Sequence, residues 1–258
     1  MRVVAVVSAK GGVGKTTVSA NLASALARQG RTVLAVDLDP QNALGLHFGL
    51  DPRELRGISR ATLAGEDWRG VVLQSPRGVY ALPYGVVNEN DRLAFEARLD
   101  RQPDWLSRHL RRLDLPDDAL VVLDTPPGPS AYLRQALGTA HLAVVVALPD
   151  AASYAALPLA QRLVQAYCTP RADFIGALYL VNQADNSRQL SRDVTNVMRS
   201  NFGERLAGAI HQDPAVSEAL ASDTTVLDYD RHSQATQDFV AFAERVAAVL
   251  GLQRRRAA

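Results

Sequence analysis

The chain has little of several features that would direct it to other classes of protein. Cys168 is its one cysteine, which excludes an internal disulfide framework, a CxxC redox pair and a cysteine-ligated iron–sulfur cluster within one chain. It contains no uninterrupted run of about 18 apolar residues, so we expect no membrane span. The histidines lack the spacing of metal ligands, and the Gly-x-Ser-x-Gly elbow of many hydrolases does not occur.

Charge and lysine content narrow the function classes further. The chain has 28 basic and 27 acidic residues and a net charge of +1, so its composition provides no general attraction to nucleic acid or anionic lipid. Lysine occurs only at Lys10 and Lys15, and every other basic residue is arginine. With 258 residues, 47% of them hydrophobic, the chain is long enough for one α/β domain with a large core.

Both lysines belong to one glycine-rich segment, Lys10-Gly11-Gly12-Val13-Gly14-Lys15-Thr16-Thr17. An apolar run at 3–7 precedes it and a helix-like run at 18–29 follows it, which is the strand–loop–helix context of a phosphate-binding loop. Glycines let the backbone curl so that its N–H groups point at phosphate oxygens, and the helix N-terminus adds partial positive charge. We expect Lys15 to contact the β- and γ-phosphates of a nucleoside triphosphate and Thr16 to bind Mg²⁺.

This loop departs from the usual pattern in two ways. Ala9 stands where that pattern has its first glycine, and Lys10 is an additional lysine. Together these features resemble the deviant Walker A loop of the ParA/MinD family of P-loop ATPases. The resemblance implies a homodimer with ATP at the interface, in which Lys10 reaches the nucleotide of the partner subunit. Taken alone, Lys10 could also be a solvated loop lysine.

A pair of acidic residues follows the strand expected at 32–37. Asp37 and Asp39 are two residues apart, so an extended backbone would place both carboxylates on one side. At the carboxyl end of a strand, one can hold Mg²⁺ and the other can orient an attacking water. We assign the metal to Asp37 and catalysis to Asp39, because the stretch resembles switch I of the family. The alternative is an ordinary strand-ending turn.

A third motif begins with the apolar run at 120–123. Asp124 ends this run, which is the Walker B pattern of a carboxylate that reaches Mg²⁺ directly or through water. Residues 125–128 resemble switch II of the family, which implies that Gly128 can offer its N–H to the γ-phosphate.

Two later segments are candidates for contacts with adenine. Asn182 follows the strand expected at 174–181, and the resemblance implies that it reads the adenine edge with its amide donor and acceptor. A turn asparagine is the alternative. Asp213 and Pro214 are suited to the N-cap and first position of a helix. The resemblance places their loop beside the base, where Asp213 itself fits a structural role better.

The order of apolar runs and helical segments predicts an α/β fold, a P-loop NTPase with a mostly parallel central sheet and helices on both faces. We expect strands at 3–8, 32–37, 120–124, 142–148, 174–181 and 206–210. The expected helices are 16–29, 91–99, 104–113, 130–137, 152–167, 188–202, 215–222 and 234–250. Residues 70–85 favour a hairpin or edge pair. One domain should cover 1–252, followed by a short Arg-rich tail at 253–258.

Segments outside the nucleotide site resemble BcsQ, the ParA/MinD-like protein of bacterial cellulose secretion systems. They are 63–69, 82–85, 210–213 and 218–221. This resemblance implies a cytoplasmic protein recruited to the inner membrane by cellulose synthase complex proteins and small accessory subunits. Some BcsQ proteins have lost loop lysines. Because Lys10, Lys15 and Asp39 are present here, we expect slow ATP hydrolysis that a partner stimulates.

Other roles stay open. Arg108, Arg111 and Arg112 lie at i, i+3 and i+4 of an expected helix and, with the terminal arginines, could bind DNA as ParA-type segregation ATPases do. Such a face is more often only solvated. A scaffold with ATP as a fixed ligand is another alternative. MinD-like membrane anchoring is not expected, because the apolar stripe at 239–250 fits packing on the sheet and only 253–258 remain after 252.

Overall fold

The computed structural model describes residues 1–51 and 55–252, which form an eight-stranded sheet with the order β3-β4-β2-β5-β1-β6-β7-β8. All neighbouring strands pair in parallel except β3 and β4. The strands are β1 (Arg2–Val7), β2 (Val33–Asp37), β3 (Leu73–Gln74), β4 (Tyr80–Leu82), β5 (Leu120–Asp124), β6 (Leu142–Ala147), β7 (Gly176–Ala184) and β8 (Leu206–His211).

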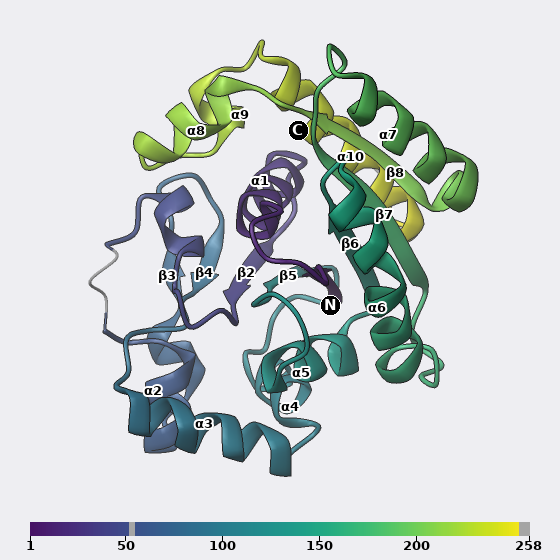
Figure 1. The fold of residues 1–258 in the computed structure, drawn as a ribbon. Helices are drawn as coiled ribbons and strands as arrows, with labels where there is room; N and C mark the ends of the chain where they lie inside the picture. The colour runs from purple at the N-terminus through teal and green to yellow at the C-terminus, as the bar shows by residue number, and fades with distance from the viewer. Residues whose placement is uncertain (52–54, 253–258) are drawn as a thin grey trace.

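Helices cover both faces of this sheet (Figure 1). They are α1 (Lys15–Arg28), α2 (Ile58–Ala64), α3 (Glu89–Arg101), α4 (Trp105–Arg112), α5 (Ala131–Thr139), α6 (Ala151–Tyr167), α7 (Gln189–Phe202), α8 (Pro214–Ala221), α9 (Val226–Tyr229) and α10 (Gln234–Val249). Short 3₁₀ turns are η1 (Leu44–Phe48), η2 (Trp68–Val71) and η3 (Gly203–Arg205).

The core consists of two hydrophobic clusters, one on each side of the sheet. Alternate residues of β1 contribute to different clusters: Val3 and Ala5 pack with residues of α3 to α6, whereas Val4 and Val6 pack with residues of α1 and α10. A central parallel strand is therefore buried on both faces, which is why it reads as a continuous apolar run.

All the expected strands and helices are present, with ends shifted by at most three residues. The hairpin expected at 70–85 is the antiparallel β3–β4 pair at one edge of the sheet. Strand β7 differs most, because it continues to Ala184 through a register shift after Val181, with Gln183 at a φ of 57°. Asn182 thus lies inside the strand rather than after it. Helices α2 and α9 and the 3₁₀ turns were not among the elements expected from the sequence.

Two expectations concern the membrane and the tail. Within the described residues, the structure contains no helix with the length and apolar content needed to cross a bilayer. The Arg-rich tail at 253–258 lies outside the described residues.

Candidate nucleotide site

The phosphate loop connects the end of β1 to the start of α1. Gly12 and Gly14 have φ values of 73° and 82°, in the left-handed region that glycine adopts readily. Gly14 is the N-cap of α1, and having no side chain it leaves the N–H groups of the first turn open. That turn contains no acidic residue. The positive end of α1 is therefore available to an anion.

Asn182 of β7 contacts the phosphate loop through its side chain. Its Nδ2 donates a hydrogen bond to the carbonyl of Val13 at 2.8 Å, and a Cβ atom on Gly14 would lie 2.4 Å from the same nitrogen. No larger residue fits at position 14 unless Asn182 moves. Since the amide is engaged with the loop in this structure, a contact of Asn182 with adenine stays a prediction.

Asp124, fully buried at the end of β5, is bound by two hydroxyl groups of α1. Thr16 Oγ1 donates to Asp124 Oδ2 at 2.7 Å, and Ser19 Oγ lies 2.9 Å from Asp124 Oδ1. Ser19 Oγ is also 2.9 Å from the carbonyl of Lys15, so its single proton can serve one of the two acceptors at a time. Ser19 was not among the expected site residues, although it lies one helical turn after Lys15 and so on the same face of α1.

Burial shifts the pKa values of the charged side chains around the phosphate loop. It raises the pKa of Asp124 to about 6, although the hydroxyls of Thr16 and Ser19 and the charge of Lys15 oppose the rise. Burial also lowers the pKa of Lys15, against the attraction of Asp124 and Asp39. Phosphates beside Lys15 and a cation beside Asp124 would favour the charged form of each. Hydroxyl and carboxylate oxygens are hard ligands, so Thr16 and Asp124 fit Mg²⁺ that keeps waters and nucleotide phosphates as its other ligands.

Asp37 and Asp39 differ in burial and in backbone structure: Asp37 is buried at the end of β2, whereas Asp39 is half-buried in the turn that follows. Asp37 is 1% exposed and accepts hydrogen bonds from the backbone N–H groups of Asp39 at 2.9 Å and Leu44 at 3.0 Å. Burial, and then the charge of Asp124, raises its pKa well above the usual range. Strand β2 ends at Asp37, and half-buried Asp39 accepts the N–H of Gln41 at 2.9 Å. The extended backbone expected between the two carboxylates is replaced by a turn that Asp37 anchors.

Switch II lies against the phosphate loop. A Cβ atom on Gly11 would approach Pro127 to 3.7 Å, and the Thr125 hydroxyl donates to the carbonyl of Val6 at 2.8 Å. The N–H of Gly128 donates to the carbonyl of Ser8 at 3.3 Å. Its predicted contact with a γ-phosphate would require this bond to open.

Lys10 has a partner within its own chain. Its Nζ lies 3.4 Å from Asp150 Oδ2, and the two side chains are 41% and 36% exposed. Asp150 is the N-cap of α6, where its Oδ1 accepts the N–H of Ser153 at 2.6 Å. Sequence reasoning missed Asp150, because the contact joins residues 140 positions apart.

A pocket of about 510 Å³ opens beside the loop. Asp213 belongs to its wall, but its carboxylate accepts the N–H groups of Ala215 at 3.0 Å and Ala235 at 3.1 Å, so it has the structural role expected for it. Pro214 is the first residue of α8, as expected. This pocket is lined by Gly14, Thr17, Asn182, Gln183, Ile210, His211, Gln212, Asp213, Pro214, Val216, Ser217, Leu220 and Phe239.

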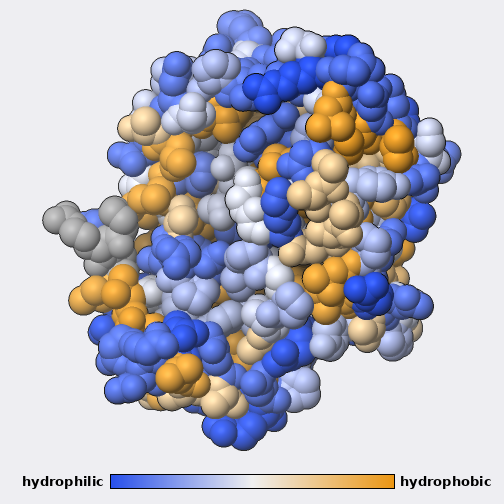
Figure 2. Space-filling view, viewed as in Figure 1, coloured by the Kyte–Doolittle hydropathy of each residue, from blue (hydrophilic) through white to orange (hydrophobic). Residues whose placement is uncertain are grey.

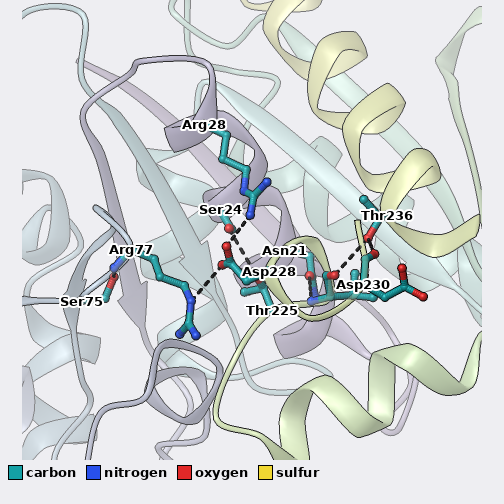
Figure 3. Close-up of polar contacts among 10 residues, drawn as sticks. Asn21, Ser24, Arg28, Ser75, Arg77, Thr225, Asp228, Asp230 and Thr236 are labelled. Carbon is teal, nitrogen blue, oxygen red and sulfur yellow. Dashed lines mark hydrogen bonds and ion pairs between the residues drawn. The ribbon is translucent and has the colours of Figure 1, made fainter. Parts of the chain in front are cut away.

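A polar cluster joins α1 to distant parts of the chain (Figure 3). Asp228 forms ion pairs with Arg28 at the end of α1 and with Arg77 Nε, at 3.2 Å, in the β3–β4 turn. Asn21 Oδ1 accepts the N–H of Val226 at 3.0 Å. The helix that begins at the phosphate loop is thus fastened along its length to the segment that follows α8.

Three comparisons place this architecture among known proteins. A family model described as "Cellulose biosynthesis protein BcsQ" matches residues 1–246. The chain is 28% identical over 251 residues to that protein of Salmonella typhimurium, covering 94% of this chain and 93% of that one. It is 35% identical over 258 residues to the chromosome-partitioning ATPase Soj of Thermus thermophilus, covering 96% of each.

A solved structure agrees with these matches. The septum site-determining protein MinD of Pyrococcus horikoshii, complexed with Mg-ADP, has a TM-score of 0.77 and 26% identity, and the match covers 97% of both chains. The P-loop NTPase fold expected from the sequence is therefore confirmed. Because the family model covers almost the whole chain and the loop, sheet and relatives are all of ParA/MinD type, the chain belongs to the BcsQ family of ParA/MinD-related P-loop ATPases.

Proposed function

We propose that this chain is an ATP-dependent dimerising switch that supports assembly or localisation of the synthase complex in a bacterial cellulose secretion system. The family match and the preserved phosphate loop support this role. Small accessory subunits and cellulose synthase complex proteins are the partners, and they recruit this cytoplasmic protein to the inner membrane.

The residues of the site divide the chemistry among them. Lys15 and the partner subunit's Lys10 neutralise charge on the phosphates, and Asp39 orients the attacking water. Thr16, Asp37 and Asp124 hold Mg²⁺, directly or through its waters, and the metal would supply further charge neutralisation at the phosphates. Asp39 is half-buried and is held by its own turn. Hydrolysis is therefore slow until a partner completes the positioning of water.

The difference in exposure between Lys10 and Lys15 is the observation that supports an ATP-dependent dimer. Lys15 is 6% exposed and is committed to the site of its own chain, whereas the side chain of Lys10 is 41% exposed at the edge of the loop. Its Asp150 partner is half-exposed too, so solvent screens the pair. Lys10 is thus available to the nucleotide of a second molecule.

Size-exclusion chromatography with light scattering tests this switch. Wild type and Lys10→Ala are compared with ATP, with ADP and without nucleotide. A dimer that requires both ATP and Lys10 supports a switch. A dimer indifferent to both supports a constitutive scaffold, and Lys10 is then an ordinary loop lysine.

A segregation ATPase that binds DNA non-specifically is the second candidate, favoured by the 35% identity to the Soj protein. The three arginines expected to form a DNA-binding face do not lie together, since Arg108 and Arg112 line one pocket and Arg111 lines another. A salt-sensitive shift of plasmid DNA that occurs only with ATP would favour it. In the source organism, gene deletion separates the two roles: loss of cellulose supports the first and loss of plasmid or chromosome supports the second.

A further inference from the structure

We propose that a second pocket, separate from the nucleotide site, binds a small phosphate-bearing molecule. This pocket lies where α2, η2, α3 and α4 meet and has a volume of about 460 Å³. None of its lining residues belongs to the phosphate loop, the switches or the base pocket. The surface over α2 and α3 is mainly hydrophilic (Figures 1 and 2).

Arginines from two helices converge on this pocket. Arg108 and Arg112 are one turn apart on α4, and Arg98 comes from α3. Arg98 Nη1 donates to the carbonyl of Thr62 at 2.6 Å, and Arg108 Nη2 donates to Gln102 Oε1 at 2.7 Å. These bonds fix two guanidinium groups and leave their other N–H groups for a ligand.

Carboxylates near the pocket neutralise these arginines only in part, since three arginines and two acidic residues line it. Asp67 is paired through both oxygens with Arg69, with Nη2 at 2.6 Å, and this pairing lowers the pKa of Asp67 to about 2. Asp104 approaches Arg108 Nη1 only to 3.8 Å. Within residues 1–51 and 55–252, Arg112 has no hydrogen bond or ion pair, and Glu66 is the remaining acidic lining residue. Positive charge is therefore in excess at the pocket.

Trp68 and His109 provide a rigid aromatic wall. Their rings stack with centroids 4.5 Å apart and an interplanar angle of 13°, and Trp105 lies 5.0 Å from Trp68. Burial, followed by the charges of Arg112, Arg108 and Arg98, lowers the pKa of His109 to about 4. The imidazole is thus neutral at neutral pH and can donate or accept a hydrogen bond.

These features together select the ligand class. Guanidinium groups bind phosphate oxygens through paired N–H bonds, and an excess of positive charge favours an anion with more than one negative charge. The volume exceeds that of phosphate, so an organic group can enter with it. A DNA backbone has the same chemistry but needs a continuous basic face, which the separate position of Arg111 does not provide.

Intrinsic fluorescence gives a local measurement, because both tryptophans of the chain, Trp68 and Trp105, belong to this cluster. Pyrophosphate and inorganic phosphate are titrated into the Lys15→Ala protein, so that the phosphate loop does not contribute, with sodium chloride at equal ionic strength as reference. We expect a saturable change with pyrophosphate. Arg108→Gln and Arg112→Gln should weaken it at least about tenfold, through loss of charge-assisted hydrogen bonds.

Arg111→Gln is the matched control, an exposed arginine on the same helix outside this pocket, and it should leave the affinity unchanged. Arg112→Lys keeps the charge but not the paired geometry, and it should still weaken binding in a fully folded protein as judged by circular dichroism. Absence of a saturable change overturns the proposal, as does equal weakening by Arg111→Gln. If duplex DNA displaces pyrophosphate and all three glutamine variants weaken that DNA, the arginines form a nucleic-acid surface instead.

Discussion

Lys10 Nζ rests 3.4 Å from Asp150 Oδ2, so the lysine proposed to act on a second molecule is held in the free chain by a carboxylate of its own. Both side chains are more than a third exposed, and such pairs contribute about 1 kcal/mol or less to stability. A contact this weak can be exchanged for a phosphate group without disturbing the fold. Folding and dimerisation should therefore respond differently to changes at Lys10.

We predict that Lys10→Ala changes the free energy of unfolding by less than about 1 kcal/mol and abolishes the ATP-dependent dimer. Urea denaturation measures the first effect and light scattering the second. Lys10→Arg is a useful companion, because it keeps the charge but alters the shape of the head group. A large loss of stability in Lys10→Ala would mean that the lost dimer reflects misfolding.

Asp150 should show the cost of losing a helix cap. Asp150→Ala removes the acceptor for the N–H of Ser153 and is expected to destabilise the protein by about 1 kcal/mol. Asp150→Asn keeps a capping oxygen and loses only the charge, so its stability should stay close to that of wild type. Thermal unfolding of the two variants compares them directly. Equal destabilisation would show that charge, rather than capping, is the main contribution of this residue.

Asp39→Ala should separate binding from hydrolysis. We expect the ATP dimer to form and persist, while phosphate release falls at least about 100-fold, because the water loses its orienting carboxylate. Lys15→Ala is the contrasting variant and should bind no nucleotide at the loop. Phosphate-release assays and chromatography of the same samples test both. Normal hydrolysis by Asp39→Ala would refute the assigned mechanism.

His47 should make stability depend on pH. It is 3% exposed in η1, and burial lowers its pKa from 6.5 to about 4. The unfolded chain therefore binds this proton more readily, so stability falls as pH decreases below 6.5 and the full loss is reached below about pH 4. Between pH 7 and pH 5 the expected loss is about 2 kcal/mol.

Urea denaturation of His47→Leu at both pH values isolates this contribution, because buried acidic groups such as Asp37 and Asp124 are common to both proteins. The unfolding free energy of wild type minus that of His47→Leu should be about 2 kcal/mol smaller at pH 5 than at pH 7, because only the wild-type histidine takes up a proton on unfolding. His232→Leu, at an exposed histidine, serves as the control. An unchanged difference would show that His47 stays protonatable in the folded state.

The amino-acid sequence predicted the features that produce a pattern in neighbouring residues, such as buried strands and the glycine loop. Central strands such as β1 are apolar along their length because both faces are buried, and the glycine loop before α1 has its own signature. The short helices α2 and α9 have too few turns to show a periodicity. The bulge at Gln183 has no comparable signal, so Asn182 was placed after β7 rather than within it.

Contacts between residues far apart in the chain could not be predicted, because they depend on how the elements pack together. Helical spacing placed Arg108 and Arg112 on one face, but the residues packed beside α4 decide which pocket each arginine enters. In the same way, an acidic residue after β6 reveals nothing of Lys10 until the ends of β1 and β6 are brought together.

The ion pairs of Asp228 should affect local unfolding of the native state. Asp228 bridges Arg28 and Arg77, and so links the end of α1, the β3–β4 turn and α9, which are distant in sequence. Segments fastened at one point open together, so their backbone amides should exchange hydrogen for deuterium as one cooperative unit. In Asp228→Asn the hairpin should exchange on its own, faster than α1, which would show how far a single carboxylate makes three remote segments behave as one.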